Sequence, residues 1–377
     1  MSLTVLSTLL HLYIAWRLVP AWSDWPFAAA ALLLVIAASA VALPLGMRGR
    51  RPRSPRWARA LTWAGYICLG LFSSLFVLTL LRDLLLVAAA LVAALAPGWP
   101  TPHALAGMTG RAVPLLAGLV TAWGFLNARR TAAVVRVDVP IAGLPEALHG
   151  FTIAQISDVH VGPTIGRDYV DAVVRSVNRL EPDMVAVTGD LVDGRVPDLA
   201  PHVAPLAGLQ SRHGTYFVTG NHEYYSGAAP WIAELRRLGM RVLLNEHVVL
   251  SHDGAPLLVA GVTDYSAHHF DAAHRSDPLA ALAGAPSEAT VRLLLAHQPR
   301  SAEAAGRAGF DLQLSGHTHG GQFWPWNHFV PLQQPFTAGL HRLGEMWIYI
   351  SRGTGYWGPP MRFGSPSEIT RIRLVRA

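Results

Sequence analysis

The sequence contains no lysine and a single cysteine, Cys68. All 30 basic residues are therefore arginine, and one thiol can build neither a disulfide framework nor a zinc site of clustered cysteines. Charged residues are also scarce, at 14% against 51% hydrophobic residues, which is more apolar than an average soluble chain. The composition therefore indicates that part of the protein lies in a membrane.

Acidic residues are almost absent from the first 130 residues, where only Asp24 and Asp83 occur. This part carries eleven arginines and a net charge near +9, whereas residues 131–377 have a net charge near −3. The overall charge of +6 therefore reflects the apolar N-terminal part, and it is no argument for nucleic-acid binding by the remainder. We expect two domains, residues 1–130 and residues 131–377.

Long apolar runs fill the first domain. Residues 3–22, 26–46 and 61–81 are each close to the roughly 20 residues that a helix needs to cross a bilayer, and a further run spans 112–127. A cleaved signal peptide is the alternative for the first run, but it shows no short apolar core followed by a small-residue cleavage site. We predict about four transmembrane helices, the third extended or bent near Arg82, with five helices as the alternative.

Six arginines in residues 47–59 predict the orientation of these helices, because positively charged loops stay in the cytoplasm. With four helices the chain returns to the cytoplasm near Arg130, whereas five would place the second domain outside. We expect a multi-pass cell-membrane protein with a cytoplasmic C-terminal domain and the lipid bilayer as its partner. The polar residues in these helices are too few to define a transport pathway, so we interpret the helices as an anchor.

From about residue 136 the chain alternates short apolar runs with amphipathic segments. The runs "FTIAQIS" (151–157), "MVAVTG" (184–189) and "TYFVTG" (215–220) are typical of short buried strands that end in a polar turn. Residues 168–180 place their valines on one helical stripe. The alternation predicts an α/β layered domain.

Polar side chains directly follow five of the apolar runs. In open α/β sheets the carboxyl ends of the strands border the crevice where ligands bind, so five such clusters can converge on one site. The clustered residues are Asp158 and His160, Asp190 and Asp193, Asn221 and His222, His297, and His317 with His319 of the "GHTHGG" stretch.

Each cluster has a simpler interpretation when taken alone. Asp158 could cap a turn beside a surface His160, Asn221 could cap a helix, and His297 could be a satisfied core histidine. These readings do not explain why every cluster lies at the end of an apolar run. We therefore interpret the clusters together as one metal site.

The order of the motifs, Asp-x-His, GDxxD, GNHE, a separate histidine and GHTH, resembles the calcineurin-like metallophosphoesterase superfamily. The stretches "QISDVHVG", "GHTHGGQ" and "YISRGTGYWGPPMRFGSPSEITRIRL" are similar to its membrane-associated bacterial branch and to transmembrane proteins that carry this domain. The resemblance covers about residues 148–377. It implies a four-layer αββα sandwich of mixed α/β class, preceded here by the all-α transmembrane region.

Carried over residue by residue, the resemblance implies two divalent metal ions that share one aspartate. Imidazole, carboxylate and amide ligands without thiolate suit manganese, iron or zinc, and we favour manganese. A metal pair would clamp the attacking and leaving oxygens of a phosphoryl displacement. The first implied ligand set is Asp158, His160, Asp190 and His319, and the second is Asp190, Asn221, His297 and His317.

His222 has a different role in the resemblance. The histidine at this position of the family motif is not a metal ligand but faces the leaving oxygen, which an imidazolium can stabilise or protonate. Asp193, three residues after Asp190, is then the carboxylate that orients His222. A turn or cap role for Asp193 is the alternative.

We therefore predict a membrane-anchored, dinuclear phosphohydrolase that cleaves a phosphodiester, pyrophosphate or phosphomonoester bond. Its expected partner is a phosphorylated small molecule or a lipid-linked envelope precursor, and no nucleic acid. A phosphoprotein phosphatase and a non-catalytic metal-binding sensor or scaffold are the alternatives. The sequence indicates no oligomeric state.

Other polar and aromatic residues have more than one interpretation. Arg352 and Arg362 could each bind a phosphate or take part in a surface ion pair. The histidines of residues 265–275 are expected to be solvated rather than metal ligands, with the substrate groove as the alternative. The aromatic residues of 324–329 could belong to the core, to a wall that stacks on the substrate or to a membrane-facing edge.

Overall fold

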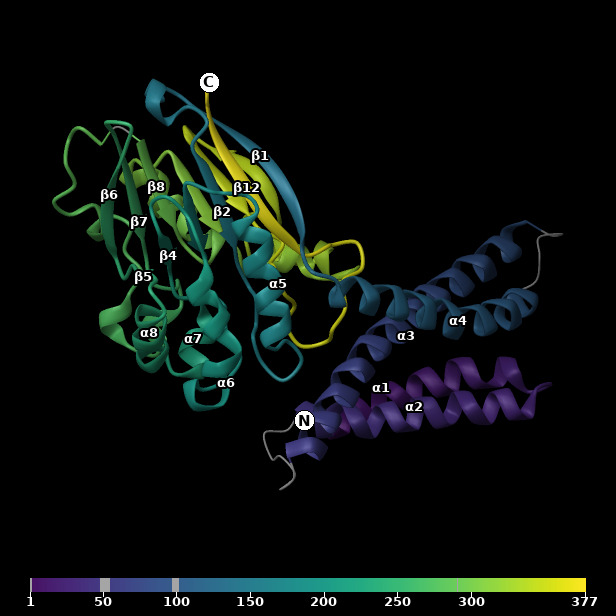
Figure 1. Ribbon diagram of the computed structural model, residues 1–377. Helices are drawn as coiled ribbons and strands as arrows, with labels where there is room; N and C mark the ends of the chain where they lie inside the picture. The colour runs from purple at the N-terminus through teal and green to yellow at the C-terminus, as the bar shows by residue number, and fades with distance from the viewer. Residues whose placement is uncertain (1, 48–54, 97–101, 290) are drawn as a thin grey trace. The chain divides into compact units, whose positions relative to one another are not determined.

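The computed structural model describes residues 2–47, 55–96, 102–289 and 291–377 (Figure 1). The chain forms two compact units, one of Met1–Asn127 with Gly358–Met361 and one of Ala128–Trp357 with Arg362–Ala377. The first boundary lies three residues before the expected one, and the assignment of Gly358–Met361 to the first unit was not expected. Most of the arginine-rich segment 47–59 lies outside the described residues.

The first unit contains long helices that are apolar enough to cross a membrane. Within the described residues there are four of these, as the apolar runs predict, and α3 continues as one helix through Arg82. Of the two forms that the sequence left open, α3 is thus the extended one. The helices are α1 (Leu3–Leu18), α2 (Pro26–Met47), α3 (Pro55–Leu95) and α4 (Pro102–Arg129).

Charged side chains of the helical unit are paired with one another. The guanidinium of Arg17 in α1 donates to both carboxylate oxygens of Asp83 in α3, at 2.8–3.0 Å, and the Tyr13 hydroxyl donates to Asp83 at 2.7 Å. Arg82 also contacts Asp83, at 3.2 Å, and donates to the Ala106 carbonyl of α4 at 3.0 Å. Mutual pairing lowers the cost of keeping these charges in an apolar helix bundle.

The second unit contains two six-stranded sheets. In the first, β2 to β5 run parallel, while β12 pairs antiparallel with β2 and parallel with β1. Its spatial order is β1 (Ala133–Ile141), β12 (Glu368–Arg376), β2 (Thr152–Ile156), β3 (Met184–Val187), β4 (Thr215–Phe217) and β5 (Arg241–Val242).

The second sheet has a parallel centre with an antiparallel strand at each edge. Its spatial order is β10 (Gly339–Leu343), β11 (Met346–Ile350), β9 (Leu312–Ser315), β8 (Val291–Leu295), β7 (Ala255–Gly261) and β6 (Glu246–His252). Residue 290, directly before β8, is not described.

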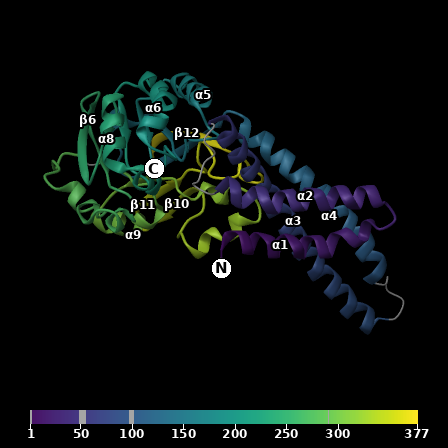
Figure 2. The same ribbon diagram turned by 90° about the horizontal axis from the view of Figure 1, so that it is seen from below.

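The two sheets pack face to face, because one buried apolar cluster takes side chains such as Ile153 and Met184 from the first and Val259 and Leu293 from the second. Figure 2 shows α5 (Arg167–Asn178), α6 (Val196–Val203) and α8 (Ala228–Arg237) on one side of the sheets and α9 (Ala302–Ala308) on the other. This order of helix, sheet, sheet and helix is the predicted αββα sandwich.

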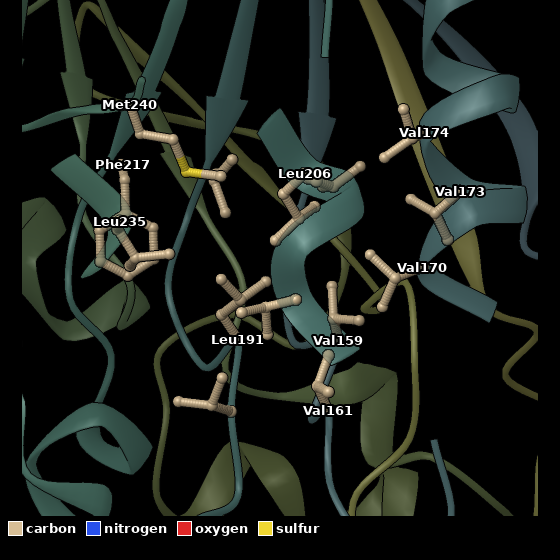
Figure 3. Close-up of a cluster of buried hydrophobic side chains, with 14 of the residues drawn as sticks. Val159, Val161, Val170, Val173, Val174, Leu191, Leu206, Phe217, Leu235 and Met240 are labelled. Carbon is tan, nitrogen blue, oxygen red and sulfur yellow. The ribbon is translucent and has the colours of Figure 1, made fainter. Parts of the chain in front are cut away.

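The helix α5 packs on the outer face of the first sheet through the valine stripe that the sequence predicts. Val170, Val173 and Val174 of α5 point into the buried cluster drawn in Figure 3, which also contains Phe217 of β4. Burying each such side chain contributes roughly 1.5–3 kcal/mol, so this face fixes α5 on the sheet. The ends of β2, β3 and β4 therefore lie in a well-packed part of the domain.

Candidate metal centre

The sequence clusters leave neighbouring strands at the same edge of the two sheets. Asp158 and His160 follow β2, Asp190 and Asp193 follow β3, and α7 (Asn221–Ser226) begins after β4. From the second sheet, His297 follows β8, and His317 and His319 follow β9. Because β2–β4 and β7–β9 are each parallel, these strand ends lie side by side.

Strained backbone marks the same residues. Asp158, His160, Asp190, His317 and His319 all have φ between 52° and 70°, a region that non-glycine residues rarely adopt. Each such residue costs of order 1–3 kcal/mol, and such strain is retained mainly where function requires it. Five of the nine non-glycine residues with positive φ in the described chain are predicted metal ligands.

Three of the four predicted ligands of the first metal form a tight group. His160 Nε2 and His319 Nε2 are 3.0 Å apart, and His319 Nε2 lies 3.4 Å from Asp158 Oδ1. His160 Nδ1 donates to Asp193 Oδ1 at 3.0 Å, so in the neutral ring the lone pair of Nε2 faces the group. The donor atoms of Asp158, His160 and His319 lie within 4.8 Å of one another, which suits one cation.

The second predicted set is also brought together. His297 Nδ1 donates to the Thr188 carbonyl at 2.8 Å, which leaves its Nε2 free to face Asp190 Oδ2 at 3.1 Å and His317 Nδ1 at 3.2 Å. Burial, together with neighbouring His297, lowers the pKa of His317 to about 3, so this imidazole is neutral and able to bind a cation. Asn221 Oδ1 is buried and has no hydrogen-bond partner among the described residues, as expected for a metal ligand.

Asp190 lies between the two groups. Its Oδ2 is 3.1 Å from His297 Nε2 and 3.9 Å from His160 Nε2, one histidine from each set. Its Oδ1 accepts the backbone N–H of His222 at 2.8 Å, which fixes the carboxylate. This position between the sets is the one that a shared ligand needs.

Asp193 contacts two histidines with one oxygen. Asp193 Oδ1 accepts from His222 Nδ1 at 2.6 Å and from His160 Nδ1 at 3.0 Å. Burial would raise the pKa of Asp193, but the charges and hydrogen bonds of His160 and His222 hold it well below its usual range, so the group is a carboxylate. Asp193 thus orients a predicted ligand as well as His222, whereas the sequence predicted only the contact with His222.

Glu223 also belongs to the site, although no role was predicted for it. Its buried carboxylate accepts three backbone N–H groups, from Gly220 at 2.7 Å, Leu191 at 2.8 Å and Asp190 at 3.0 Å. Burial and the charge of Asp190 raise the pKa of Glu223 to about 7. A sequence signal existed, because a glutamate three residues after an N-cap is half of a capping box.

Arg362 also supports a predicted ligand, a role that the sequence did not predict. Its side chain is fully buried and donates to the carbonyls of Gly355, Arg352 and His319. Its Nη2 is also 3.1 Å from Nδ1 of His319. Arg362 therefore holds the loop of a predicted ligand in place, and its hydrogen bonds exclude the interpretation of an exposed phosphate clamp.

At two positions of the site, only glycine leaves enough space between the backbone and its neighbours. A Cβ on Gly220 would overlap the carboxylate of Asp190, and a Cβ on Gly316 would overlap Ser157 and Asp158. Because backbone atoms must pass this close to the ligands, neither position can carry a side chain.

The remaining polar and aromatic candidates lie outside the ligand groups. The rings of His268 and His269 lie 4.0 Å apart and are tilted by 42°, and neither residue belongs to a group of candidate metal ligands in the described residues. The side chains of Trp326 and Phe329 are exposed, so the core interpretation of this aromatic run is wrong. Arg352 forms an ion pair with buried Glu368 at 2.8 Å.

Comparison with known proteins places the sequence among metal-dependent phosphoesterases. A family model described as calcineurin-like phosphoesterase matches residues 151–321. A transmembrane protein with metallophosphoesterase domain from Bos taurus is 45% identical over 281 residues, which cover 70% of this chain and 63% of that protein. A protein of the same name from Danio rerio is 38% identical over 271 residues, which cover 70% of this chain and 62% of that protein.

A bacterial relative is matched over most of its length. An uncharacterized metallophosphoesterase of Aquifex aeolicus is 36% identical over 224 residues, which cover 59% of this chain and 84% of that protein. The chain spans a little less than two thirds of the two transmembrane relatives.

Proposed function

Because the chain belongs to the calcineurin-like metallophosphoesterase family, we propose that it is a membrane-anchored hydrolase that uses two divalent metal ions to cleave a phosphoester or phosphoanhydride bond. The family establishes the class of enzyme. The particular metal sites, the catalytic roles and the substrate are our assignments from the geometry.

We assign the two ligand groups to one cation each, with Asp190 shared. The orphaned Asn221 Oδ1 and the Nε2 atoms of His160 and His297, which face the groups, support this assignment. The donors are imidazole nitrogens, carboxylate oxygens and one amide oxygen, so manganese, iron or zinc would fit, and we favour manganese. The first set is Asp158, His160, Asp190 and His319, and the second is Asp190, Asn221, His297 and His317.

When bound, the metals supply hydroxide at neutral pH and neutralise charge on the phosphoryl group. His222 acts on the leaving group. Asp193 holds its Nδ1, so Nε2, which lies 4.0 Å from Asp190 Oδ2, is the atom that carries a proton to the leaving oxygen.

The His222–Asp193 pair is the observation that carries the proposal. A purely structural metal site has no use for an oriented histidine beside its ligands. The pair therefore favours a hydrolase over the sensor or scaffold alternative. The helical unit supports a substrate that is met at the bilayer, such as a lipid-linked phosphate compound or an envelope precursor, and we place its use in the cytoplasm.

The test is hydrolysis of a chromogenic phosphodiester by the full chain in detergent, with Mn²⁺ or with chelator. We expect metal-dependent turnover of this ester. With a phosphodiester of an unactivated alcohol, whose departure needs a proton, we expect turnover to fall about 100-fold or more in His222→Ala, because a positioned general acid contributes about that much. Metal content, measured by mass spectrometry, should stay near that of the unaltered protein.

His269→Ala is the matched control, because His269 is an exposed histidine outside the ligand groups. Wild-type turnover of the unactivated ester by His222→Ala would contradict the acid assignment. Absence of turnover from a folded, metal-loaded protein with every ester tried would favour the sensor or scaffold alternative.

A further inference from the structure

Exposed aromatic side chains gather around His222. Tyr225 is 62% exposed and Trp357 is 55% exposed, and both rings contact the imidazole of His222. A third exposed ring, Phe270, packs on Tyr225. Single exposed aromatic residues are ordinary, but a group of them beside a catalytic acid indicates a binding surface.

The two rings come from different parts of the second unit and lie roughly perpendicular to the imidazole. The Tyr225 centroid is 5.1 Å from that of His222, with an interplanar angle of 68°, and the Trp357 centroid is 5.9 Å away, at 75°. Tyr225 lies in α7, three residues after the histidine, whereas Trp357 lies in the segment after β11. A group that receives a proton from His222 therefore meets aromatic surface.

The ring of Tyr225 is supported by a neighbouring aromatic side chain. Phe270 contacts Tyr225 at 5.5 Å and Tyr224 at 5.7 Å, and the Tyr224 hydroxyl is hydrogen-bonded to His274 at 2.8 Å. These contacts give Phe270 and His274 a role in supporting the aromatic surface.

The backbone of Trp357 is fixed by a single side-chain amide. Its N–H donates to Gln322 Oε1, and its carbonyl accepts from Gln322 Nε2, both at 2.9 Å. Gln322 follows His319 by three residues, so the position of the indole is tied to the loop of a predicted metal ligand. A pre-positioned surface costs little conformational entropy when a ligand binds.

The arginines that could have offered a charged alternative are engaged elsewhere. Arg362 is buried and donates to backbone carbonyls, and Arg352 is paired with Glu368. A leaving group with a second phosphate would therefore find aromatic rings beside His222 and neither of these two guanidinium groups.

We propose that Tyr225 and Trp357 form the binding site for the leaving group of the phosphoester, and that this leaving group is an apolar alcohol rather than a phosphorylated one. The inference rests on the proposed function, because it takes His222 as the group that protonates the leaving oxygen. In the hydrolysis, the oxygen of water bonds to phosphorus, the bond from phosphorus to the leaving oxygen breaks, and His222 transfers its proton to that oxygen. The released alcohol then leaves along the aromatic surface.

The test uses three methyl phosphodiesters, in which the second ester is methyl, hexyl or 2-phenylethyl. These alcohols are all unactivated primary alcohols, so differences in rate report binding of the leaving group rather than its chemistry. The full chain in detergent with Mn²⁺ is compared with Trp357→Ala and Tyr225→Ala, and the alcohol released is measured by chromatography. The hexyl and 2-phenylethyl esters distinguish an alkyl chain from a planar ring as the preferred group.

We expect kcat/KM for at least one apolar ester to exceed that for dimethyl phosphate by about tenfold or more, and this ratio to fall towards one in both variants. Tyr265→Ala is the matched control, because Tyr265 is exposed but lies against Arg300 rather than His222, and it should keep the ratio. Melting temperatures check that the variants are folded.

The outcomes separate the two proposals. Equal rates for the three esters, or a ratio that both alanine variants preserve, would overturn the leaving-group site while leaving the hydrolase intact. Absence of metal-dependent hydrolysis with any ester, including the chromogenic one, would overturn the proposed function itself.

Discussion

At the scale of single residues, one buried carboxylate holds two loops of the metal centre together. Glu223 accepts N–H groups from Asp190 and Leu191 after β3 and from Gly220 after β4. Asp190, the proposed shared ligand, and Asn221, a predicted ligand, lie in these two loops. The spacing between the two predicted ligand sets therefore depends on a side chain that belongs to neither set.

The substitution Glu223→Gln tests this dependence. All three partners of Glu223 are donors, and an amide offers one acceptor oxygen and a donor of its own, so at least one backbone N–H loses its partner. We expect the free energy of unfolding to fall by about 1–3 kcal/mol and the metal affinity to fall about tenfold, as measured by thermal melting and by metal titration. Glu303→Gln, at an exposed glutamate of α9, is the control and should change neither quantity. Unchanged metal affinity in Glu223→Gln would show that the loops are held by other contacts.

Asp190→Asn tests the shared ligand. Because the amide has one neutral oxygen and cannot serve two cations as a carboxylate does, we expect both metals and activity to be lost together. The metal content of the purified protein should fall from about two ions per chain to one or none, as mass spectrometry can measure. Asp198→Asn, at an exposed position in α6, should retain both ions. Retention of two ions by Asp190→Asn would exclude the bridging assignment.

Local motifs explain why so much of the site could be predicted. His222 and the predicted ligands sit within a few residues of strand ends, where parallel strands bring them together. The capping-box spacing of Glu223 signals only its bond to Gly220, because its other partners, like those of Arg362, are backbone groups of distant loops. Arg362, for example, donates to the carbonyl of His319, 43 residues away.

At the scale of elements, glycine allows two of the apolar helices to approach closely. A Cβ on Gly46 of α2 would lie 2.7 Å from Gly65 Cα of α3 and 2.7 Å from the Leu61 carbonyl oxygen. Small residues of this kind let helix backbones touch in membranes, where lipid offers no hydrophobic force between helices.

Gly65→Val should therefore weaken the packing of α2 on α3. The added side chain has no space, so we expect a destabilisation of about 1–3 kcal/mol, seen as earlier thermal aggregation in detergent. Gly107→Val in α4 is the matched control, since a Cβ at Gly107 meets nothing within 4 Å and the change in helix propensity is the same. Equal loss of stability in both variants would show that the contact contributes nothing.

Pairing between elements is the part of the fold that the sequence predicts least. The apolar runs indicate individual strands, yet β1 and β12 lie side by side although Asp138 and its partner Arg373 are 235 residues apart. In the same way, Asp83 of α3 is paired with Arg17 of α1, 66 residues away. Neither pairing leaves a mark in the local sequence.

At the scale of the whole molecule, the side of the membrane is the testable property. Six arginines in residues 47–59, four of them between α2 and α3, predict that this segment lies in the cytoplasm, and two further helices would return the chain to the same side. We expect a fluorescent protein fused to the C-terminus to be fluorescent and a fused alkaline phosphatase, which needs the periplasm, to be inactive. The reverse result would place the C-terminal domain outside the cytoplasm, through either an odd number of membrane crossings or an inverted orientation of the four helices.

The segment Gly358–Met361 limits how freely the helical unit could be removed or replaced. The chain enters the helical unit for these four residues between Trp357, beside the predicted acid, and Arg362, which holds the loop of a predicted ligand. Met361 lies against Gly70 of α3, where a Cβ would be 3.2 Å from its sulfur. Removal of residues 1–127 would therefore leave Met361 without Gly70 as its neighbour. This segment of the first unit interrupts the chain of the second unit, so the two units are not independent in sequence. A chimera that replaces the helices would also need a redesigned Gly358–Met361.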